Sequence, residues 1–250
     1  MHIPAGKKVY FLSDFHLGVP DHASSLVREK KIVAFLERAK ADAATIFIVG
    51  DLFDFWFEYR KVVPKGFVRI LGKLAELTDA GIPVHFFVGN HDMWMSGYFE
   101  KELNIPVYHE SRVFEFNGKK LLVGHGDGLG PGDHGYKTIK KVFRNPLLKF
   151  LFGLIPPFFG ISLAAYFSKS SRASTGESDE KFLGEDNEWL ILYCRQLLKE
   201  NEYDYFVFGH RHLPIDFQLN EKSRYINLGD WIKYDSYAVF DGTALQLKFN

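Results

Sequence analysis

The chain has 250 residues, of which 46% are hydrophobic, 25% charged and 16% aromatic. These proportions exclude a disordered, collagen-like or coiled-coil chain, and the length allows one large domain or one domain with an insertion. Lysine plus arginine and aspartate plus glutamate both number 31, and this net charge of zero argues against nucleic acid as a partner.

Short apolar runs alternate with stretches of helical spacing in the first part of the chain. The opening residues, 1–8, contain no apolar run, so we expect no signal peptide and a cytoplasmic protein. After them, the pattern predicts strands over 9–12, 45–49 and 84–88 and helices over 26–39 and 67–80. This alternation of strand and helix predicts βαβ units that share one sheet.

The second half of the chain changes to a β-rich rhythm. Asn117-Gly118 is typical of a hairpin turn, here between strands predicted over 113–116 and 119–123. Further strands are predicted over 205–208, 215–219, 225–228, 237–240 and 244–249, and a helix over 185–199. That helix holds the only cysteine, Cys194, which excludes an internal disulfide and a zinc site built from cysteines. The whole pattern predicts an α/β fold of two sheets packed face to face, with helices outside.

A segment of different composition separates these two halves. Between His134 and Gly176 there are seven lysines or arginines and no acidic residue, and residues 150–168 carry no charge. We predict a helical, apolar and basic cap inserted over 136–199 into a core formed by 1–135 and 200–250. The basic and apolar residues suit an anionic lipid surface, whereas the alternative is a buried helical hairpin with a solvated basic face.

Five predicted strands end in a polar motif that contains aspartate, asparagine or histidine. Groups beyond the carboxyl ends of strands meet where open α/β sheets bind their ligands. Carboxylate, imidazole and amide oxygen suit a pair of divalent metals such as Mn, Fe, Zn, Co or Ni, and no thiolate is offered. Each motif alone is common in ordinary turns, but five of them in this order are not expected by chance. The motifs are Asp14-Phe15-His16, Gly50-Asp51-Leu52-Phe53-Asp54, Gly89-Asn90-His91-Asp92, Gly124-His125-Gly126-Asp127 and Gly209-His210-Arg211-His212.

This order of motifs resembles the calcineurin-like metallophosphoesterases, whose pattern is D-x-H, G-D-x-x-D, G-N-H-D, G-H and G-H-x-H. The resemblance implies a four-layer αββα sandwich and two divalent metal ions, with manganese as the family expectation. His91 would face the phosphate as a catalytic residue oriented by Asp92, and Asp54 would orient a group that binds metal. The implied metal ligands are Asp14, His16 and His212 for one metal, Asn90, His125 and His210 for the other, and Asp51 as the bridge.

A closer resemblance rests on the residues that flank these motifs. Residues 51–59, DLFDFWFEY, and 209–214, GHRHLP, are similar to those of the UDP-2,3-diacylglucosamine diphosphatases of lipid A biosynthesis. The resemblance covers most of the chain. It implies hydrolysis of the pyrophosphate bond of a UDP-sugar lipid by a water held between the two metals. The products would be UMP and 2,3-diacylglucosamine 1-phosphate. Many relatives carry arginine at the position of His91, where the general family has histidine.

The same resemblance implies where this protein works and what it contacts. Its partners would be a UDP-linked acylated glucosamine lipid and an anionic membrane surface, on the inner face of the inner membrane, with no protein partner. Besides Asn90, His91 and His210 of the motifs, two other residues are candidate substrate contacts. Asp133 lies where relatives contact the glucosamine unit, and Arg144 is a candidate phosphate contact by its charge and position.

Two other functions stay open on the sequence. A dinuclear-metal phosphodiesterase or phosphatase acting on another nucleotide or phosphoester would share every metal ligand, and only the apolar cap speaks against it. A membrane-associated scaffold could keep the metals for structure alone. The complete ligand set and His91 argue against that second alternative.

Overall fold

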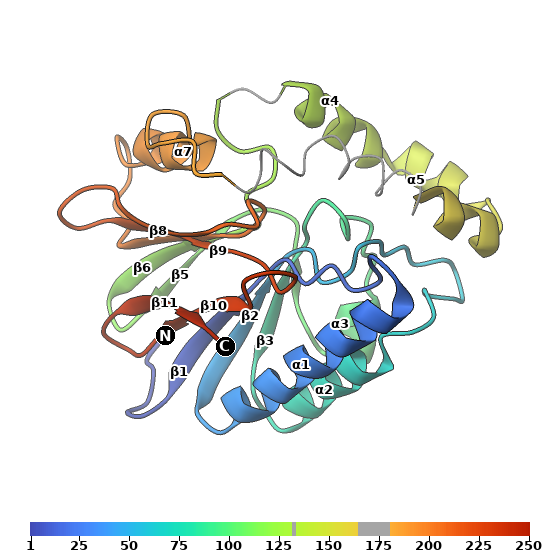
Figure 1. The fold of residues 1–250 in the computed structure, drawn as a ribbon, viewed down its shortest axis with the longest axis horizontal. Helices are drawn as coiled ribbons and strands as arrows, with labels where there is room; N and C mark the ends of the chain where they lie inside the picture. Colours follow the sequence, from blue (N-terminus) through green and yellow to red (C-terminus); the bar gives the residue numbers. More distant parts are fainter. Residues whose placement is uncertain (132–133, 165–180) are drawn as a thin grey trace.

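Two β-sheets form the centre of the computed structural model, which describes residues 1–131, 134–164 and 181–250 (Figure 1). In spatial order the first sheet contains β11 (Leu245–Phe249), β10 (Ser236–Phe240), β1 (Lys8–Leu12), β2 (Ala43–Val49), β3 (Val84–Phe87) and β4 (Val107–Tyr108). The second contains β5 (Arg112–Phe116), β6 (Lys119–Val123), β7 (Tyr205–Phe208), β9 (Arg224–Leu228) and β8 (Pro214–Gln218).

The pairing within the first sheet confirms the predicted βαβ units. β1, β2, β3 and β4 run parallel, and Tyr10 of β1 lies opposite Ile46 of β2. The last two strands of the chain return to this sheet rather than to the second one, because β10 pairs antiparallel with β1 and β11 with β10. In the second sheet, β5 and β6 form the predicted hairpin, and β6, β7 and β9 are parallel.

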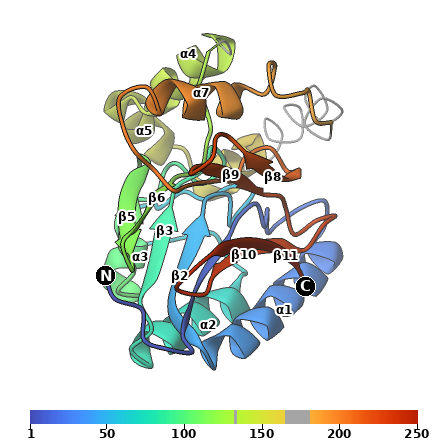
Figure 2. The same cartoon turned by 90° about the vertical axis from the view of Figure 1, so that its left-hand side faces the viewer.

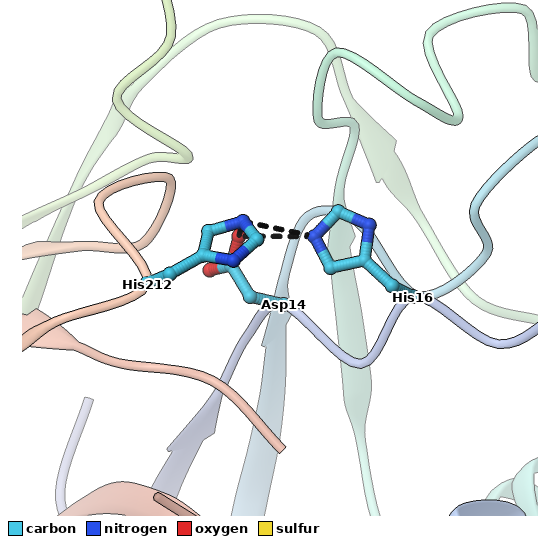
Figure 3. Close-up of side chains that lie close together, drawn as sticks. All are labelled: Asp14, His16 and His212. Carbon is cyan, nitrogen blue, oxygen red and sulfur yellow. Dashed lines mark hydrogen bonds and ion pairs between the residues drawn. The ribbon is translucent and has the colours of Figure 1, made fainter. Parts of the chain in front are cut away.

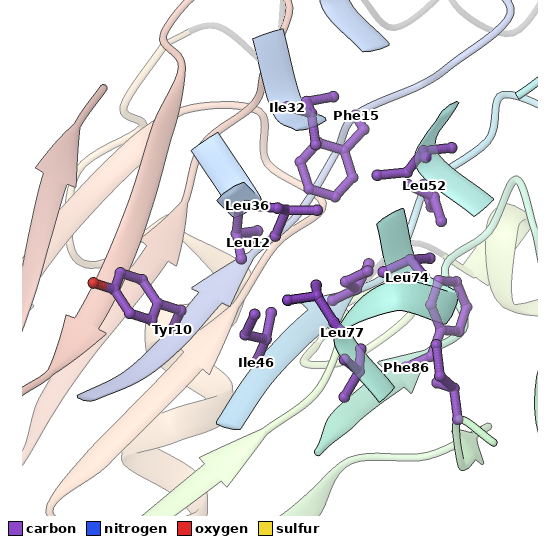
Figure 4. Close-up of a cluster of buried hydrophobic side chains, with 14 of the residues drawn as sticks. Tyr10, Leu12, Phe15, Ile32, Leu36, Ile46, Leu52, Leu74, Leu77 and Phe86 are labelled. Atoms are coloured by element: carbon purple, nitrogen blue, oxygen red, sulfur yellow. The ribbon is translucent and has the colours of Figure 1, made fainter. Parts of the chain in front are cut away.

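Helices α1 (His22–Lys40) and α2 (Val68–Asp79) cover the outer face of the first sheet. Asp21 caps α1 by accepting the backbone N–H of Ser24, so this helix begins earlier than its apolar spacing indicates. The apolar stripes of both helices pack on alternate residues of the strands, which lie on one face because side chains alternate along a strand. Figure 4 shows this cluster, with Ile32, Leu36, Leu74 and Leu77 of the helices facing Leu12, Ile46 and Phe86 of the strands.

The inner faces of the two sheets form a second core. Phe11 and Phe47 of the first sheet are buried with Val123 and Ile226 of the second. On the far side of the second sheet, α7 (Trp189–Leu197) buries Cys194 and two neighbouring aliphatic residues against β7 and β9. The order is therefore helices, sheet, sheet, helix, and it confirms the predicted four-layer αββα fold.

The segment predicted as a cap begins with α4 (His134–Phe143) and α5 (Pro146–Gly153). Asn145 caps α5 by accepting the backbone N–H of Leu147. Figures 1 and 2 show α4, α5 and α7 on the side of the molecule opposite α1 and α2, while the short α3 (Tyr98–Glu102) follows β3 in the core. Within the described ranges, no helix has the length and apolar character needed to cross a membrane. The division into core and cap stays a prediction.

Candidate metal centre

The structure brings the five polar motifs together at one edge of the two sheets. Asp14 follows β1, Asp51 follows β2 and Asn90 follows β3, and these three strands are parallel. His125 and His210 follow β6 and β7, which are parallel in the other sheet. Parallel strands deliver the residues after their carboxyl ends to the same edge. All seven predicted metal ligands consequently lie in loops at this edge, where the contacts below join them.

The loops that carry these residues turn too sharply for ordinary backbone conformations. Asp14, His16 and Asp51 have φ values of 55°, 43° and 53°, and His210 and His212 have 70° and 49°. Such left-handed backbone costs roughly 1–2 kcal/mol per residue, and strain of this kind concentrates at functional sites. The folded core must therefore hold these loops in place.

Glycine beside the ligands is required by close approach. A Cβ atom at Gly209 would collide with Ser13 Oγ and Asp14 Oδ2, and one at Gly89 would collide with Asp51 Oδ1. Because these neighbours include the predicted metal ligands, a larger residue could fit only by displacing them. The motifs thus need glycine at these positions, because only a residue without a side chain fits beside the ligands.

Asp14, His16 and His212 form the first group of candidate ligands, and all three point toward a common centre (Figure 3). The Nε2 atoms of His16 and His212 are 3.0 Å apart. Asp14 Oδ1 lies 3.7 Å from His16 Nε2 and 3.4 Å from His212 Nε2. One carboxylate and two imidazole nitrogens thus converge as a metal site requires.

The second group of candidate ligands meets at the side-chain oxygen of Asn90. Asn90 Oδ1 is 3.0 Å from His210 Nδ1 and 3.2 Å from His125 Nε2. Asp51 Oδ2 joins the two groups, because it lies 3.2 Å from His125 Nε2 and 3.7 Å from His16 Nε2. This position between the groups is the one predicted for a bridging carboxylate.

Acceptors lie beside the second nitrogen of three imidazole rings. His125 Nδ1 donates to the carbonyl oxygen of Val49 at 2.8 Å, so Nε2 is the nitrogen that can bind a metal once it has lost its proton. Asp54 Oδ1 lies 3.6 Å from His16 Nδ1, too far for a hydrogen bond, and its role in orienting a ligand stays a prediction. Asp230 Oδ2 lies at the same 3.6 Å from His212 Nδ1. Asp230 was not predicted, although it follows β9 in a Gly-Asp pair like the one that contains Asp51.

Two buried carboxylate oxygens test whether these residues fit metal ions. Asp14 Oδ1 and Asp51 Oδ2 have no hydrogen-bond partner within the described part of the chain. An unpartnered buried charge is costly unless a cation or a hydrogen-bond donor satisfies it. The donor set of hard oxygens and imidazole nitrogens suits divalent metals, so the residues present fit the two ions that the sequence predicts.

The electrostatics of the cluster point the same way. Burial opposes the charge of Asp14, but His16, His125 and His212 together hold its pKa at about 2. Burial likewise opposes protonation of His16 and His125, yet the surrounding carboxylates raise the pKa of each to about 10. Burial lowers the pKa of His210 to about 4 and that of His212 to about 3. Positive charge therefore stabilises the buried carboxylates, and bound metal ions would supply this charge in place of the protons.

These pKa values predict proton release when metal binds. The pKa values of His16 and His125 lie above neutral pH, so both rings hold an extra proton that ligation must remove. We expect chelator-stripped protein to release about two protons near pH 8, and its metal affinity to rise toward pH 10 by on the order of tenfold per pH unit for each proton. Calorimetric titration with Mn²⁺ in buffers of different ionisation enthalpy measures this number.

Two histidine variants make that measurement specific. His125→Asn should lower the number of released protons by about one. His22→Asn, at an exposed histidine on α1, should leave it unchanged. A heat of binding that does not depend on the buffer would contradict the prediction.

His91 lies at the edge of the cluster. Its backbone N–H donates to Asp51 Oδ1 at 2.9 Å, and its ring packs edge-on against His16 at 4.8 Å between centroids. His91 Nδ1 lies 2.9 Å from the backbone oxygen of Asp54, which can only accept, so Nδ1 carries the hydrogen. Burial lowers the pKa of His91.

Asp92 acts on the loop that carries His91. Its carboxylate accepts the backbone N–H groups of Gly89 at 2.7 Å and Leu52 at 2.9 Å, and so ties two motif loops together. Burial, with the charge of Asp51, raises the pKa of Asp92 to about 7. Asp54 contacts the His91 ring through its backbone oxygen, whereas the orienting role of Asp92 stays a prediction.

Of the other four predicted substrate contacts, the structure describes three. Arg144 is exposed at the end of α4, where its guanidinium donates to the carbonyl oxygen of His109 at 2.8 Å. Asp133 lies outside the described residues. Asn90 and His210 lie in the metal cluster itself. The substrate roles of all four stay predictions.

The sequence and the fold assign the chain to a known class. The family model for calcineurin-like phosphoesterases matches residues 7–214, and the chain belongs to this family. Membership, together with the Asp and His cluster, makes it a hydrolase that depends on divalent metals. A dimetal phosphatase from Danio rerio shares the fold, with a TM-score of 0.50 at 13% identity over 98% of this chain and 96% of the other.

Two curated relatives are closer in sequence. The chain is 42% identical to the UDP-2,3-diacylglucosamine hydrolase of Porphyromonas gingivalis, over 96% of this chain and 97% of the relative. It is 28% identical to the UDP-2,3-diacylglucosamine hydrolase of Yersinia pestis, over 82% of this chain and 81% of the relative.

Proposed function

We propose that this protein hydrolyses the pyrophosphate bond of UDP-2,3-diacylglucosamine to UMP and 2,3-diacylglucosamine 1-phosphate. The observation that carries the proposal is the 42% identity, over nearly the whole of both chains, to the Porphyromonas gingivalis UDP-2,3-diacylglucosamine hydrolase. The cluster of seven candidate ligands supports it, because two divalent metals lower the pKa of a water and offset charge on a phosphoryl group.

The proposal gives each residue of the cluster a role. Asp51 lies between the two groups of ligands and would bridge them. His91 would face the phosphate through Nε2, since Nδ1 is engaged with the backbone oxygen of Asp54. In its imidazolium form, which the negative phosphate would favour against burial, it would stabilise charge and give the Nε2 proton to the leaving oxygen. Water would attack the phosphorus nearest the uridine, and the acylated sugar phosphate would leave. The native metals would be manganese.

The apolar side chains of the cap support a lipid substrate. Leu147, Phe150 and Leu154 of α5 and its end are exposed, and Phe158 and Phe159 follow with 77% and 63% of their surface exposed. Soluble proteins rarely expose so much contiguous apolar surface without a binding role. These residues would contact acyl chains and the lipid surface at the cytoplasmic face of the inner membrane.

An aromatic cluster links the cap to the motif loops. The Phe152 ring of α5 lies 4.8 Å from that of Phe57 and 4.7 Å from that of Trp94, between centroids. Phe57 lies three residues after Asp54, and Trp94 two residues after Asp92. A lipid held along α5 would therefore lie next to loops that carry the cluster.

Three lysines of the cap contact the core, which the sequence does not indicate. Lys137 donates to the carbonyl oxygen of Gly130, and Lys149 donates to that of Met95 at 3.4 Å. Lys140 donates to the carbonyl oxygen of Asp127 at 2.8 Å and pairs with its carboxylate at 2.5 Å. The proposed contact with an anionic membrane consequently rests on the exposed apolar side chains rather than on these cations.

A comparison of two substrates tests the proposed function. We expect chelator-stripped protein, given Mn²⁺, to release UMP from UDP-2,3-diacylglucosamine in detergent and not from UDP-N-acetylglucosamine. Mg²⁺ and Zn²⁺ would be run in parallel to identify the preferred metal. Equal cleavage of both substrates would contradict a role of the cap in recognition. No cleavage of either, with metal bound, would favour another phosphoester substrate.

A second arm separates chemistry from a structural use of the metals. His91→Ala should lower the rate by about 10²–10⁴-fold, the range for loss of a general acid, with metal content unchanged. The same result would exclude a scaffold that only stores metal. Loss of metal together with activity would instead make His91 a ligand, which its position near His16 and Asp51 also allows.

A further inference from the structure

A buried ion pair adjoins the loop that carries two of the candidate metal ligands. Arg211, between the ligands His210 and His212 in the chain, and Glu188, just before α7, both have 0% of their side-chain surface exposed. Arg211 Nε and Nη2 donate to the two oxygens of the Glu188 carboxylate at 3.1 and 2.9 Å. The guanidinium also donates to the carbonyl oxygen of Lys181 at 2.7 Å and lies 4.6 Å from the centre of the Trp189 ring.

Burying this ion pair costs free energy, so its presence calls for a functional reason. Two charges lose their hydration here, and an apolar pair of similar volume often stabilises a fold equally well. The guanidinium instead makes two parallel bonds in a fixed plane, which set direction as well as distance. The backbone on either side of Arg211 is left-handed at His210 and His212 and needs such a restraint.

The first turn of α7 touches a second motif loop as well. A Cβ atom at Gly130 would collide with the carbonyl oxygen of Trp189, and one at Gly126 would lie 3.2 Å from Leu190 Cδ1. Both glycines belong to the loop that follows His125. The three consecutive residues 188–190 therefore contact the loops that carry both groups of ligands.

We propose that Glu188 and Arg211 are positioning residues that fix His210 and His212 for metal binding. Through the Lys181 carbonyl and α7, they also join the last part of the predicted cap to the loop that carries His210 and His212. The inference rests on the proposed ligand roles of His210 and His212, and its test must separate the two.

The test measures the affinity of stripped protein for Mn²⁺ by calorimetry, well below the melting temperature. Glu188→Gln and Arg211→Lys should each weaken binding by about 10–100-fold, as loss of groups that orient metal ligands does. If a single variant fails to fold, the double variant Glu188→Leu/Arg211→Met removes both charges at similar volume and should show the same loss. Ile191→Ala, a buried change on α7 that alters neither charge, should keep wild-type affinity.

Each outcome decides between explanations. Wild-type affinity in the folded double variant would overturn the inference, even if Glu188→Gln binds weakly, because uncompensated charge would then be the cause. An equal loss in Ile191→Ala would also overturn it, since general loosening of α7 would suffice. His212→Ala serves as the reference: wild-type affinity in that variant would refute the ligand assignment itself. Loss in His212→Ala without loss at Glu188 or Arg211 would refute only the positioning role.

Discussion

Asp51→Asn is expected to lower kcat by on the order of a thousandfold or more and to deplete bound metal, because bridging two metals contributes several kcal/mol. Asparagine keeps the size of the side chain and one oxygen to accept the His91 backbone N–H. It removes the charge that lies within 3.2 Å of His125 and 3.7 Å of His16. The measurements are metal content by elemental analysis and UMP release at saturating substrate.

A matched substitution controls for loss of a carboxylate as such. Asp42→Asn breaks an ion pair with Lys8, at the opposite end of β1 from Asp14, and keeps an oxygen that can accept the Tyr10 hydroxyl. We expect it to retain wild-type metal content and rate. Near wild-type activity in Asp51→Asn would refute the assignment of Asp51 as the bridging ligand, even if variants of the other ligands lose activity.

The sequence predicts which residues meet at this edge because its signals are local. An apolar β-branched run followed at once by Asp, Asn or His gives both the strand and the residue at its carboxyl end. The edge at which they meet then follows from the parallel order of β1, β2 and β3. The sequence does not predict that β10 joins the first sheet, since its pairing with β1 joins residues more than 200 positions apart and leaves no local signal.

Contacts between residues distant in the chain also explain which features the sequence does not predict. Arg211 in a Gly-His-Arg-His motif has the composition of a solvated loop, and its burial depends on Glu188, 23 residues earlier in the chain. The lysines of α4 and α5 have the spacing of a membrane-facing surface, yet Lys137, Lys140 and Lys149 donate to carbonyl groups outside these helices. The charge pattern gives the number of cations on a helix, whereas the fold decides which groups they meet.

The second large effect concerns the exposed end of the cap. Phe158→Ser/Phe159→Ser should weaken binding to anionic lipid vesicles by on the order of 100-fold, because inserting the two rings contributes at least about 3 kcal/mol. Both side chains are mostly exposed, so the melting temperature should stay near that of the wild type. Phe152→Ser is a poorer choice, since this ring packs against Phe57 and Trp94 and its loss would disturb the cap itself.

Sedimentation with vesicles and kinetics in detergent distinguish two uses of these phenylalanines. If they only contact the membrane, cleavage of substrate in detergent micelles should keep its KM while vesicle binding is lost. If they also hold acyl chains, KM for the acylated substrate should rise in both settings. Val68→Ser, at the exposed start of α2, removes an apolar side chain without a predicted lipid contact. Equal loss of vesicle binding in Val68→Ser would place the lipid surface elsewhere, and unchanged binding in the double variant would refute the cap as the membrane contact.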